Sequence, residues 1–182
     1  MAYYTCGIQS VVKFVVRLSI ASFFRRMYWT EIGYQSTIQT ALMEGTKRSI
    51  MVQDKLKWPV GLALDAPAKR LYWCDLKLKR VESISLDLRD RHLIWQFVNS
   101  DMPTTIALHE NFLYVTLQSG KLYRLNKFGQ GPLTVLAHRL MRAIGLAVYQ
   151  QQQQYVPNGN VKLFCYSERV VSIQCQSIEV AK

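Results

Sequence analysis

A motif that returns every 42–44 residues constrains the fold of this sequence more than any other feature. The first copy is Met27-Tyr28-Trp29-Thr30-Glu31, and the second, 44 residues later, is Leu71-Tyr72-Trp73-Cys74-Asp75. A weaker third copy, Leu113-Tyr114-Val115-Thr116, begins 42 residues after the second. Self-similarity at a fixed period of this size indicates an array of repeated structural units.

Two further landmarks keep the same period. The segment Pro59-Val60-Gly61-Leu62-Ala63-Leu64-Asp65 precedes the second motif copy and returns at residues 103–109 and 143–149. The segment 44–48 returns 43 residues later at 87–91, where Leu88 occupies the position of Gly45. Glycine suits a turn that needs a left-handed residue, so Leu88 is the unusual member of this pair.

Each repeat contains four short stretches with the composition of β-strands. In the second repeat they cover about residues 61–64, 71–74, 81–86 and 91–97. The third stretch alternates imperfectly, because Val81 and Ile84 would lie on opposite faces of a strand. A helical repeat would need two long segments with 3.6-residue spacing, which the sequence does not have. Four short strands in each period predict a β-propeller blade.

At these residues the sequence resembles the YWTD repeats, or class B repeats, of the low-density lipoprotein receptor family. The resemblance covers roughly residues 15–149 and weakens along the chain. Cys74 stands in place of threonine, and the third copy keeps only Tyr114 and Thr116. Glu31 replaces aspartate and is one methylene longer, so we expect its hydrogen bonds to neighbouring backbone to be displaced.

The resemblance implies a six-bladed propeller, which needs about 260 residues at this period. Because the chain has 182 residues, we expect an all-β, partial six-bladed YWTD-type propeller with three recognisable four-stranded blades and a degenerate fourth. A fragment of a larger receptor is favoured over two chains that complete one ring. The expected divisions are an unassigned segment 1–14, blades at about 15–58, 59–102 and 103–142 with the next starting at 143, a Gln-rich linker at 150–160, and degenerate strands at 161–182.

The recurring motif residues are expected to be structural. Aromatic side chains that return once per blade at the same place usually pack between blades. The acidic residues near the blade ends, Glu110 among them, are expected to form structural hydrogen bonds rather than a catalytic site. The structural set is Tyr28, Trp29, Thr30, Glu31, Tyr72, Trp73, Cys74, Asp75, Tyr114, Thr116, Gly61 and Asp65.

The formal charge of +11 attracts acidic partners. Nucleic acid is not expected, because its binding would need exposed aromatic side chains in a basic groove and the recurring aromatics are assigned to the core. The resemblance implies acidic protein modules instead, namely cysteine-rich calcium-binding ligand-binding repeats, or protein ligands. Candidate partner-binding residues are Trp58, Lys77, Lys79 and Arg80, although Trp58 also suits a buried position.

The resemblance also implies release of cargo at endosomal pH, when propeller histidines gain a proton and favour an intramolecular contact. Histidine titrates in that pH range. The chain has three histidines, and all are candidate pH-sensing residues: His92, His109 and His138.

No catalytic motif, metal-ligand spacing or phosphate-binding glycine loop is present, so we expect no enzyme activity, cofactor or metal. The expected function is that of a non-catalytic interaction module of a lipoprotein-receptor-like cell-surface protein, with ligand binding, endocytic uptake and pH-dependent release. The alternatives are a secreted, nidogen-like matrix protein with the same repeats and, less favoured, a propeller hydrolase. The resemblance implies an extracellular or endosomal lumenal location, with membrane contact only through other parts of a longer receptor.

The remaining sequence signals are weak. No apolar stretch reaches the roughly 18 residues of a membrane-spanning helix. Lys13 and Arg17 interrupt the apolar N-terminal segment, so a cleaved signal peptide is not favoured. Cys165 and Cys175 suit a pair across a hairpin, but free thiols are the favoured interpretation.

Overall fold

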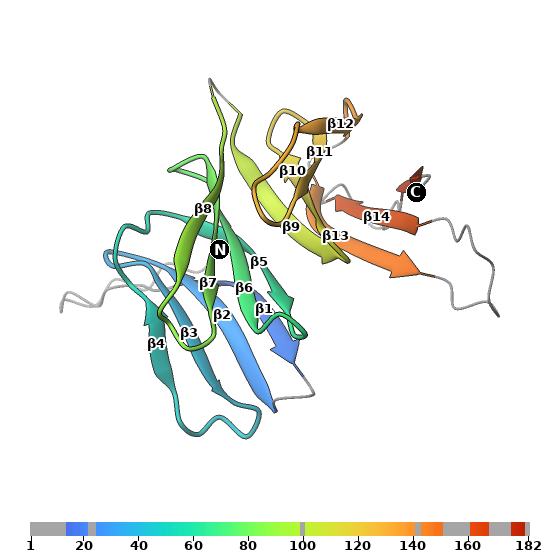
Figure 1. Cartoon of the computed structure of the whole chain (residues 1–182). Helices are drawn as coiled ribbons and strands as arrows, with labels where there is room; N and C mark the ends of the chain where they lie inside the picture. Colours follow the sequence, from blue (N-terminus) through green and yellow to red (C-terminus); the bar gives the residue numbers. More distant parts are fainter. Residues whose placement is uncertain are drawn as a thin grey trace.

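The chain forms four antiparallel sheets that follow one another along the sequence (Figure 1). The computed structural model describes residues 14–21, 25–98, 101–140, 143–150, 161–167 and 176–180. The unassigned N-terminal segment up to residue 13, the Gln-rich stretch 151–160 and Cys175 lie outside these residues, as does the side chain of Cys165. Among the described residues, no helix has the length and apolar character needed to cross a membrane.

Each sheet is a simple meander in which neighbouring strands are consecutive in sequence. We name the sheets blades 1 to 4 in chain order. Blade 1 contains β1 (Phe14–Ala21), β2 (Arg26–Ile32), β3 (Thr37–Leu42) and β4 (Ser49–Val52). Blade 2 contains β5 (Pro59–Asp65), β6 (Arg70–Asp75), β7 (Arg80–Ser85) and β8 (Arg91–Gln96). Blade 3 contains β9 (Pro103–His109), β10 (Phe112–Leu117), β11 (Leu122–Asn126) and β12 (Thr134–Ala137), and blade 4 contains β13 (Ala143–Gln150), β14 (Val161–Ser167) and β15 (Gln176–Val180).

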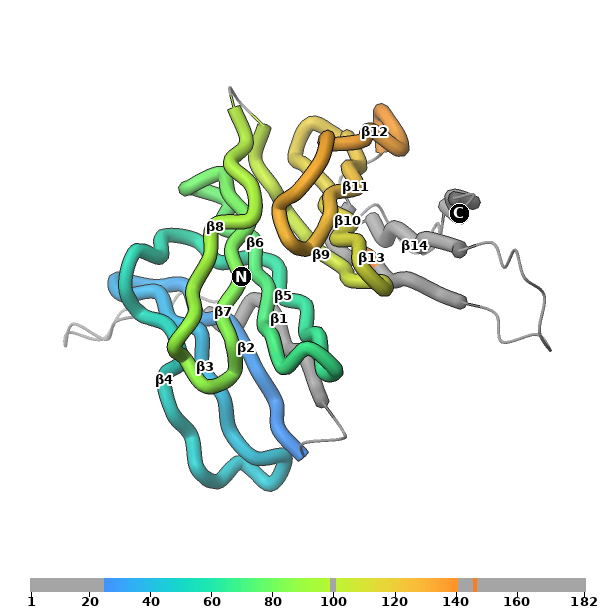
Figure 2. Tube along the Cα trace, viewed as in Figure 1, coloured from blue at the N-terminus to red at the C-terminus, as the bar shows by residue number. Residues whose placement is uncertain are grey.

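The first strands of successive blades contact one another in the order β1, β5, β9 and β13. Figure 2 follows the same path along the Cα trace, with each blade folded beside the one before it. Within the described residues, three blades have four strands and the fourth has three. The prediction of an all-β, partial propeller with a degenerate fourth blade is confirmed.

Blade 2 is joined to both of its neighbours by side chains from its two faces. Trp73 is fully buried and packs with Tyr28 and Ile38 of blade 1. Its neighbour Tyr72 is 1% exposed and packs towards blade 3, in a cluster with Val115. Adjacent residues of a strand point to opposite faces, so a blade between two others is apolar on both sides.

The position of blade 2 between two other blades explains the imperfect polar–apolar alternation of its third strand. Val81 lies in the cluster shared with blade 3, whereas Ile84 lies in the cluster shared with blade 1. Both side chains are buried, at 0% and 5% exposed. A strand with two covered faces needs apolar residues on each of them, and a strict polar–apolar alternation is therefore absent.

A buried ion pair and a close approach of the backbone at a glycine fix the interface between blades 2 and 3. Lys127 Nζ lies 2.8 Å from Asp65 Oδ2, and both side chains are almost fully buried. A buried ion pair of this kind is costly to break, because either charge alone would be left without a partner. Gly61 also lies at this joint: an added Cβ would stand 2.6 Å from Cys74 Sγ and 3.0 Å from the backbone nitrogen of Ile106. Only glycine allows that approach.

The turns at residues 44–48 and 87–91, which are equivalent in the repeat, both contain a residue with left-handed backbone. Gly45 has a φ of 84° and Leu88 has a φ of 66°. Leu88 therefore occupies a left-handed position that its side chain disfavours by about 1–2 kcal/mol. Its side chain is 47% exposed, so little packing depends on it.

Replacing Leu88 with glycine should relieve this strain. We expect Leu88→Gly to have a higher free energy of unfolding than Leu88→Ala by roughly 0.5–1 kcal/mol, because alanine keeps the Cβ that clashes in the left-handed region. The alanine variant is the matched control for the lost side chain. Urea denaturation of both variants measures the difference, and equal stabilities would show that the turn is unstrained.

Candidate functional site

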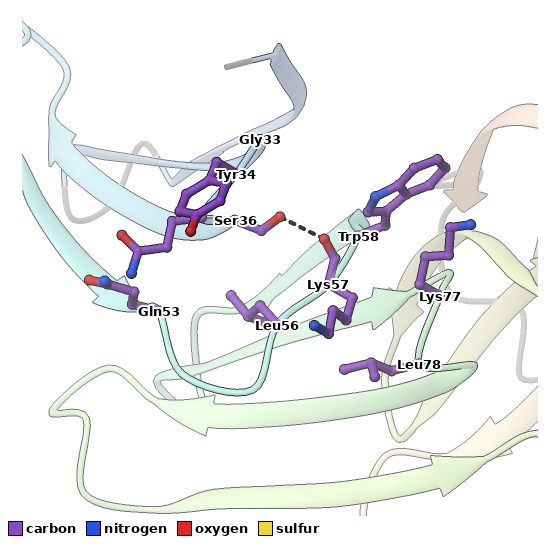
Figure 3. A pocket seen from close by; sticks show the side chains of 10 residues that line it. Gly33, Tyr34, Ser36, Gln53, Leu56, Lys57, Trp58, Lys77 and Leu78 are labelled. Carbon is purple, nitrogen blue, oxygen red and sulfur yellow. Dashed lines mark hydrogen bonds between the residues drawn. The ribbon is translucent and has the colours of Figure 1, made fainter. Parts of the chain in front are cut away.

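The described chain has a surface pocket between blades 1 and 2, which we call the Trp58 pocket (Figure 3). Three loops form it: the β2–β3 loop, the β4–β5 loop and the β6–β7 loop. It encloses about 610 Å³. Its lining residues include two lysines but no aspartate or glutamate, and they are Gly33, Tyr34, Gln35, Ser36, Gln53, Leu56, Lys57, Trp58, Lys77 and Leu78.

The carboxylate of Asp75 holds two of these loops. Asp75 is fully buried at the end of β6. Its Oδ2 accepts a hydrogen bond of 2.8 Å from the backbone N–H of Lys57, and its Oδ1 accepts bonds of 3.1 and 2.9 Å from those of Trp58 and Leu78. Ser36 Oγ ties in the third loop by donating to the Lys57 carbonyl at 2.6 Å. The last residue of the second YWTD-like motif therefore organises the pocket.

A second carboxylate, Glu82, supports the β4–β5 loop from blade 2. Glu82 Oε2 lies 2.9 Å from Arg80 Nε and 3.0 Å from Arg91 Nη2. The two guanidinium groups also donate across the blade joint, Arg80 to the carbonyl of Lys55 and Arg91 to the carbonyl of Asp54, both at 2.7 Å. The loop that carries Trp58 is thus fixed by charged hydrogen bonds, which are among the stronger ones in proteins.

The structure separates the four candidate partner-binding residues. Trp58 is 43% exposed, and Lys77 is exposed with its Nζ 4.4 Å from the centroid of the Trp58 ring. Lys79 is partly buried and has a left-handed backbone. Arg80 is directed to Glu82 and the Lys55 carbonyl, with its side chain only 20% exposed. The Trp58 pocket therefore brings together Trp58 and Lys77 but not the other two.

Sequence reasoning missed Tyr34 as part of this surface. Its side chain is 93% exposed in the β2–β3 loop, across the pocket from Trp58 in Figure 3. The available signal was its position directly after the first motif copy, in the segment Gly33-Tyr34-Gln35-Ser36 that has turn-forming residues.

Blade 1 has a different arrangement at the position that corresponds to Asp75. Glu31 Oε1 accepts hydrogen bonds from Trp29 Nε1 at 3.0 Å and from Arg48 Nη2 at 2.8 Å. Its Oε2 accepts one from Gln39 Nε2 at 2.8 Å. These are side-chain partners, so the extra methylene lets Glu31 reach across the sheet, whereas Asp75 accepts from backbone.

The register explains this difference. Gln39 lies opposite Trp29 as Glu82 lies opposite Trp73. Arg48 stacks over Trp29 at 5.3 Å from its centroid, and the corresponding Arg91 stacks over Trp73 at 5.2 Å. The carboxylate that holds the arginine has therefore moved from the third strand in blade 2 to the second strand in blade 1.

We expect that restoring the family's aspartate in blade 1 will destabilise it. Glu31→Asp should lower the free energy of unfolding by about 1–2 kcal/mol, because the shorter side chain withdraws from Arg48 and Trp29. Adding Gln39→Glu should recover most of the loss by placing a carboxylate where blade 2 has one. A denaturation double-mutant cycle measures this coupling. A neutral Glu31→Asp, or purely additive effects, would contradict the exchange.

The other motif residues lie within the blades and away from the Trp58 pocket. Burial raises the pKa of Tyr28, Tyr72 and Tyr114 above the ordinary tyrosine value. Thr116 is buried with its Oγ1 2.9 Å from that of Thr104. Every member of the motif set is buried: Tyr28, Trp29, Thr30, Glu31, Gly61, Asp65, Tyr72, Trp73, Cys74, Asp75, Tyr114 and Thr116.

The three histidines are not brought together, and none lines the Trp58 pocket. His92 is exposed on β8 with its Nε2 against Asp90. The hydrogen bond from Arg70 holds the pKa of Asp90 below its ordinary value. His109, at the end of β9, is largely buried with Nε2 3.7 Å from Glu110, and His138 is exposed after β12.

The described part of the chain has no group of three His, Cys, Asp or Glu side chains arranged to hold a metal ion. The chemistry of the pocket is therefore that of two ammonium groups, two exposed aromatic rings and backbone held in place by buried carboxylates. Such a surface suits recognition of a partner.

Comparison with known proteins agrees with the repeat and the fold. The model of the low-density lipoprotein receptor repeat class B matches residues 25–66. The chain is 36% identical over 104 residues to the vitellogenin receptor of Solenopsis invicta and 34% identical over 88 residues to vitellogenin receptor Yl of Drosophila melanogaster. These matches cover 57% and 48% of this chain, but only 6% and 4% of the receptors.

Two solved structures share the fold at low sequence identity. A chain of the nidogen/laminin complex matches with a TM-score of 0.69 and 21% identity, over 84% of this chain and 60% of that one. A luciferin-regenerating enzyme matches with a TM-score of 0.61 and 14% identity, over 85% of this chain and 54% of that one. These two likenesses concern the fold, whereas the family model and the receptor matches show that the chain contains a low-density lipoprotein receptor class B (YWTD) repeat and is a distant homologue of part of the vitellogenin receptors.

Proposed function

We propose that this chain is a non-catalytic, protein-binding part of a receptor of the low-density lipoprotein receptor family, engaged in ligand uptake and pH-dependent release. The observation that carries the proposal is the 36% identity over 104 residues to a vitellogenin receptor. The likenesses to an enzyme and to the nidogen/laminin complex are at 14% and 21% identity and concern the fold alone. They therefore favour neither a hydrolase nor a matrix protein.

The proposed partners are acidic protein modules, namely calcium-loaded cysteine-rich ligand-binding repeats, or protein ligands. The charge of +11 supports this, and so does the Trp58 pocket, whose lining charges are both lysines. Trp29 and Trp73 are buried and unable to stack on bases, but the exposed Trp58 and Tyr34 lie beside lysines, so nucleic acid is the competing acidic partner and needs its own control. The proposed location is the extracellular or endosomal lumenal side of a membrane.

A binding experiment tests this function directly. The probe is a recombinant cysteine-rich ligand-binding repeat from a vitellogenin receptor, loaded with calcium and titrated into this chain by calorimetry. We expect saturable binding that weakens as salt is raised, because charges on the two surfaces attract. A DNA duplex is the control for general attraction to negative charge. No binding to the repeat at low salt, or equal binding to DNA, would contradict the proposal.

The pH arm of this experiment addresses the histidines. Binding to the acidic repeat should strengthen between about pH 7.4 and about pH 5.5, because protonated histidines add positive charge to the chain. Within a receptor this contact would be intramolecular and would release the ligand. In the variant His92→Gln, His109→Gln, His138→Gln this gain should disappear. Asp90 stays ionised over that range, since Arg70 holds its pKa low, and so it does not mask the effect of the histidines. An unchanged pH response of the triple variant would exclude these histidines as the sensor.

A further inference from the structure

We propose that the Trp58 pocket binds an acidic peptide segment of a protein partner. In this arrangement Lys57 and Lys77 pair with carboxylates, while Trp58 and Tyr34 pack against the apolar side chain beside them. The inference rests on the proposed protein-binding function and assigns that function to one surface.

The charge of the pocket is positive and not neutralised from within. Lys57 and Lys77 are exposed, and no aspartate or glutamate is among the lining residues. The carboxylate beneath the pocket is that of Asp75, which is fully buried and accepts from three backbone N–H groups. Asp54 belongs to the same β4–β5 loop but does not line the pocket. A ligand carboxylate would therefore supply the missing negative charge.

The aromatic side chains leave apolar area open to solvent. Trp58 is 43% exposed and Tyr34 is 93% exposed, and the two stand on opposite sides of the pocket, with Leu56 between them in Figure 3. Tryptophan and tyrosine are enriched among the residues that dominate binding energy at protein interfaces. An apolar side chain next to an acidic one is the peptide chemistry that complements this lining.

The backbone that presents these groups is fixed before any ligand arrives. Trp58 N–H is held by Asp75, and the Trp58 carbonyl accepts from Leu76 N–H at 2.9 Å. Ser36 ties the Tyr34 loop to the Lys57 carbonyl. A prearranged surface loses less conformational entropy on binding, which favours affinity.

Lys77 occupies the face of Trp58 in the free chain, with its ammonium 4.4 Å from the ring centroid. Such a contact at an exposed site is weak, so the ammonium is easily drawn to a carboxylate. Binding should therefore change the surroundings of the Trp58 ring.

The size of the pocket limits the ligand to a short segment. A volume of about 610 Å³ suits a few residues of a peptide.

The test follows the indole N–H signal of Trp58 by nuclear magnetic resonance. The probe is a blocked hexapeptide of alternating glutamate and leucine, and its matched control has glutamine in place of each glutamate. The signal is assigned with Trp58→Phe. We expect the acidic peptide to shift this signal saturably, and the glutamine peptide to bind at least about tenfold more weakly, as expected for a lost charged pair.

Variants separate the pocket from the overall charge. Lys77→Gln should weaken binding of the acidic peptide by about three- to fivefold, as for the loss of one exposed ion pair. Lys69→Gln removes the same charge from an exposed β5–β6 turn at the opposite end of blade 2, and should change binding by less than about twofold. Circular dichroism and thermal unfolding establish that both variants keep the fold.

Three outcomes would overturn the inference: no shift of the Trp58 signal with the acidic peptide, equal binding of the two peptides, or equal effects of Lys77→Gln and Lys69→Gln. If the cysteine-rich repeat binds the chain while one of these outcomes holds, the pocket is wrong and the proposed function stands. If the acidic peptide binds at Trp58 while the repeat does not, the pocket stands and the proposed partner is wrong.

Discussion

The buried carboxylate of Asp75 is the interaction on which the arrangement of this surface depends. A negative charge inside a protein is tolerated when donors surround it, and here three backbone N–H groups from two loops do so. The cost of burying the charge is offset only while both loops stay in place. Asp75 therefore couples the end of β6 to the loop that connects blade 1 with blade 2.

In the stacking of the blades, too, a few buried residues hold two parts of the chain. Blade 2 is covered on both faces, so Trp73 and Tyr72 on one of its strands pack in two different interfaces. The repeated motif therefore joins neighbouring blades. Its polar side chains form hydrogen bonds with groups that would otherwise be buried between the blades without a partner. The surface loops that remain exposed, such as those of the Trp58 pocket, are positioned by this scaffold and are available for recognition.

Much of the fold could be predicted from the sequence because the period is carried by residues that must pack in every blade. The candidate partner-binding surface was harder to predict from the sequence. Lys77 and Arg80 look alike in sequence, but cross-strand and inter-blade geometry places Arg80 on Glu82 and leaves Lys77 exposed. The sequence did not reveal that Gln39 and Glu82 occupy equivalent positions, each opposite the tryptophan of its blade. The two tryptophans are 44 residues apart but Gln39 and Glu82 are 43 apart, so a single repeat offset does not align both pairs. The β2–β3 connection has one more residue between paired positions, and it carries the exposed Tyr34 that no periodic pattern marks.

Amide hydrogen exchange in the variant Asp75→Asn tests most directly whether this one carboxylate organises the surface. The account predicts faster exchange at the N–H groups of Lys57, Trp58 and Leu78, whereas the turn amides of Leu86 and Leu117, which bond to the carbonyls of Lys69 and Lys121, keep their protection. Unchanged exchange at Lys57, Trp58 and Leu78 in a folded variant would contradict it.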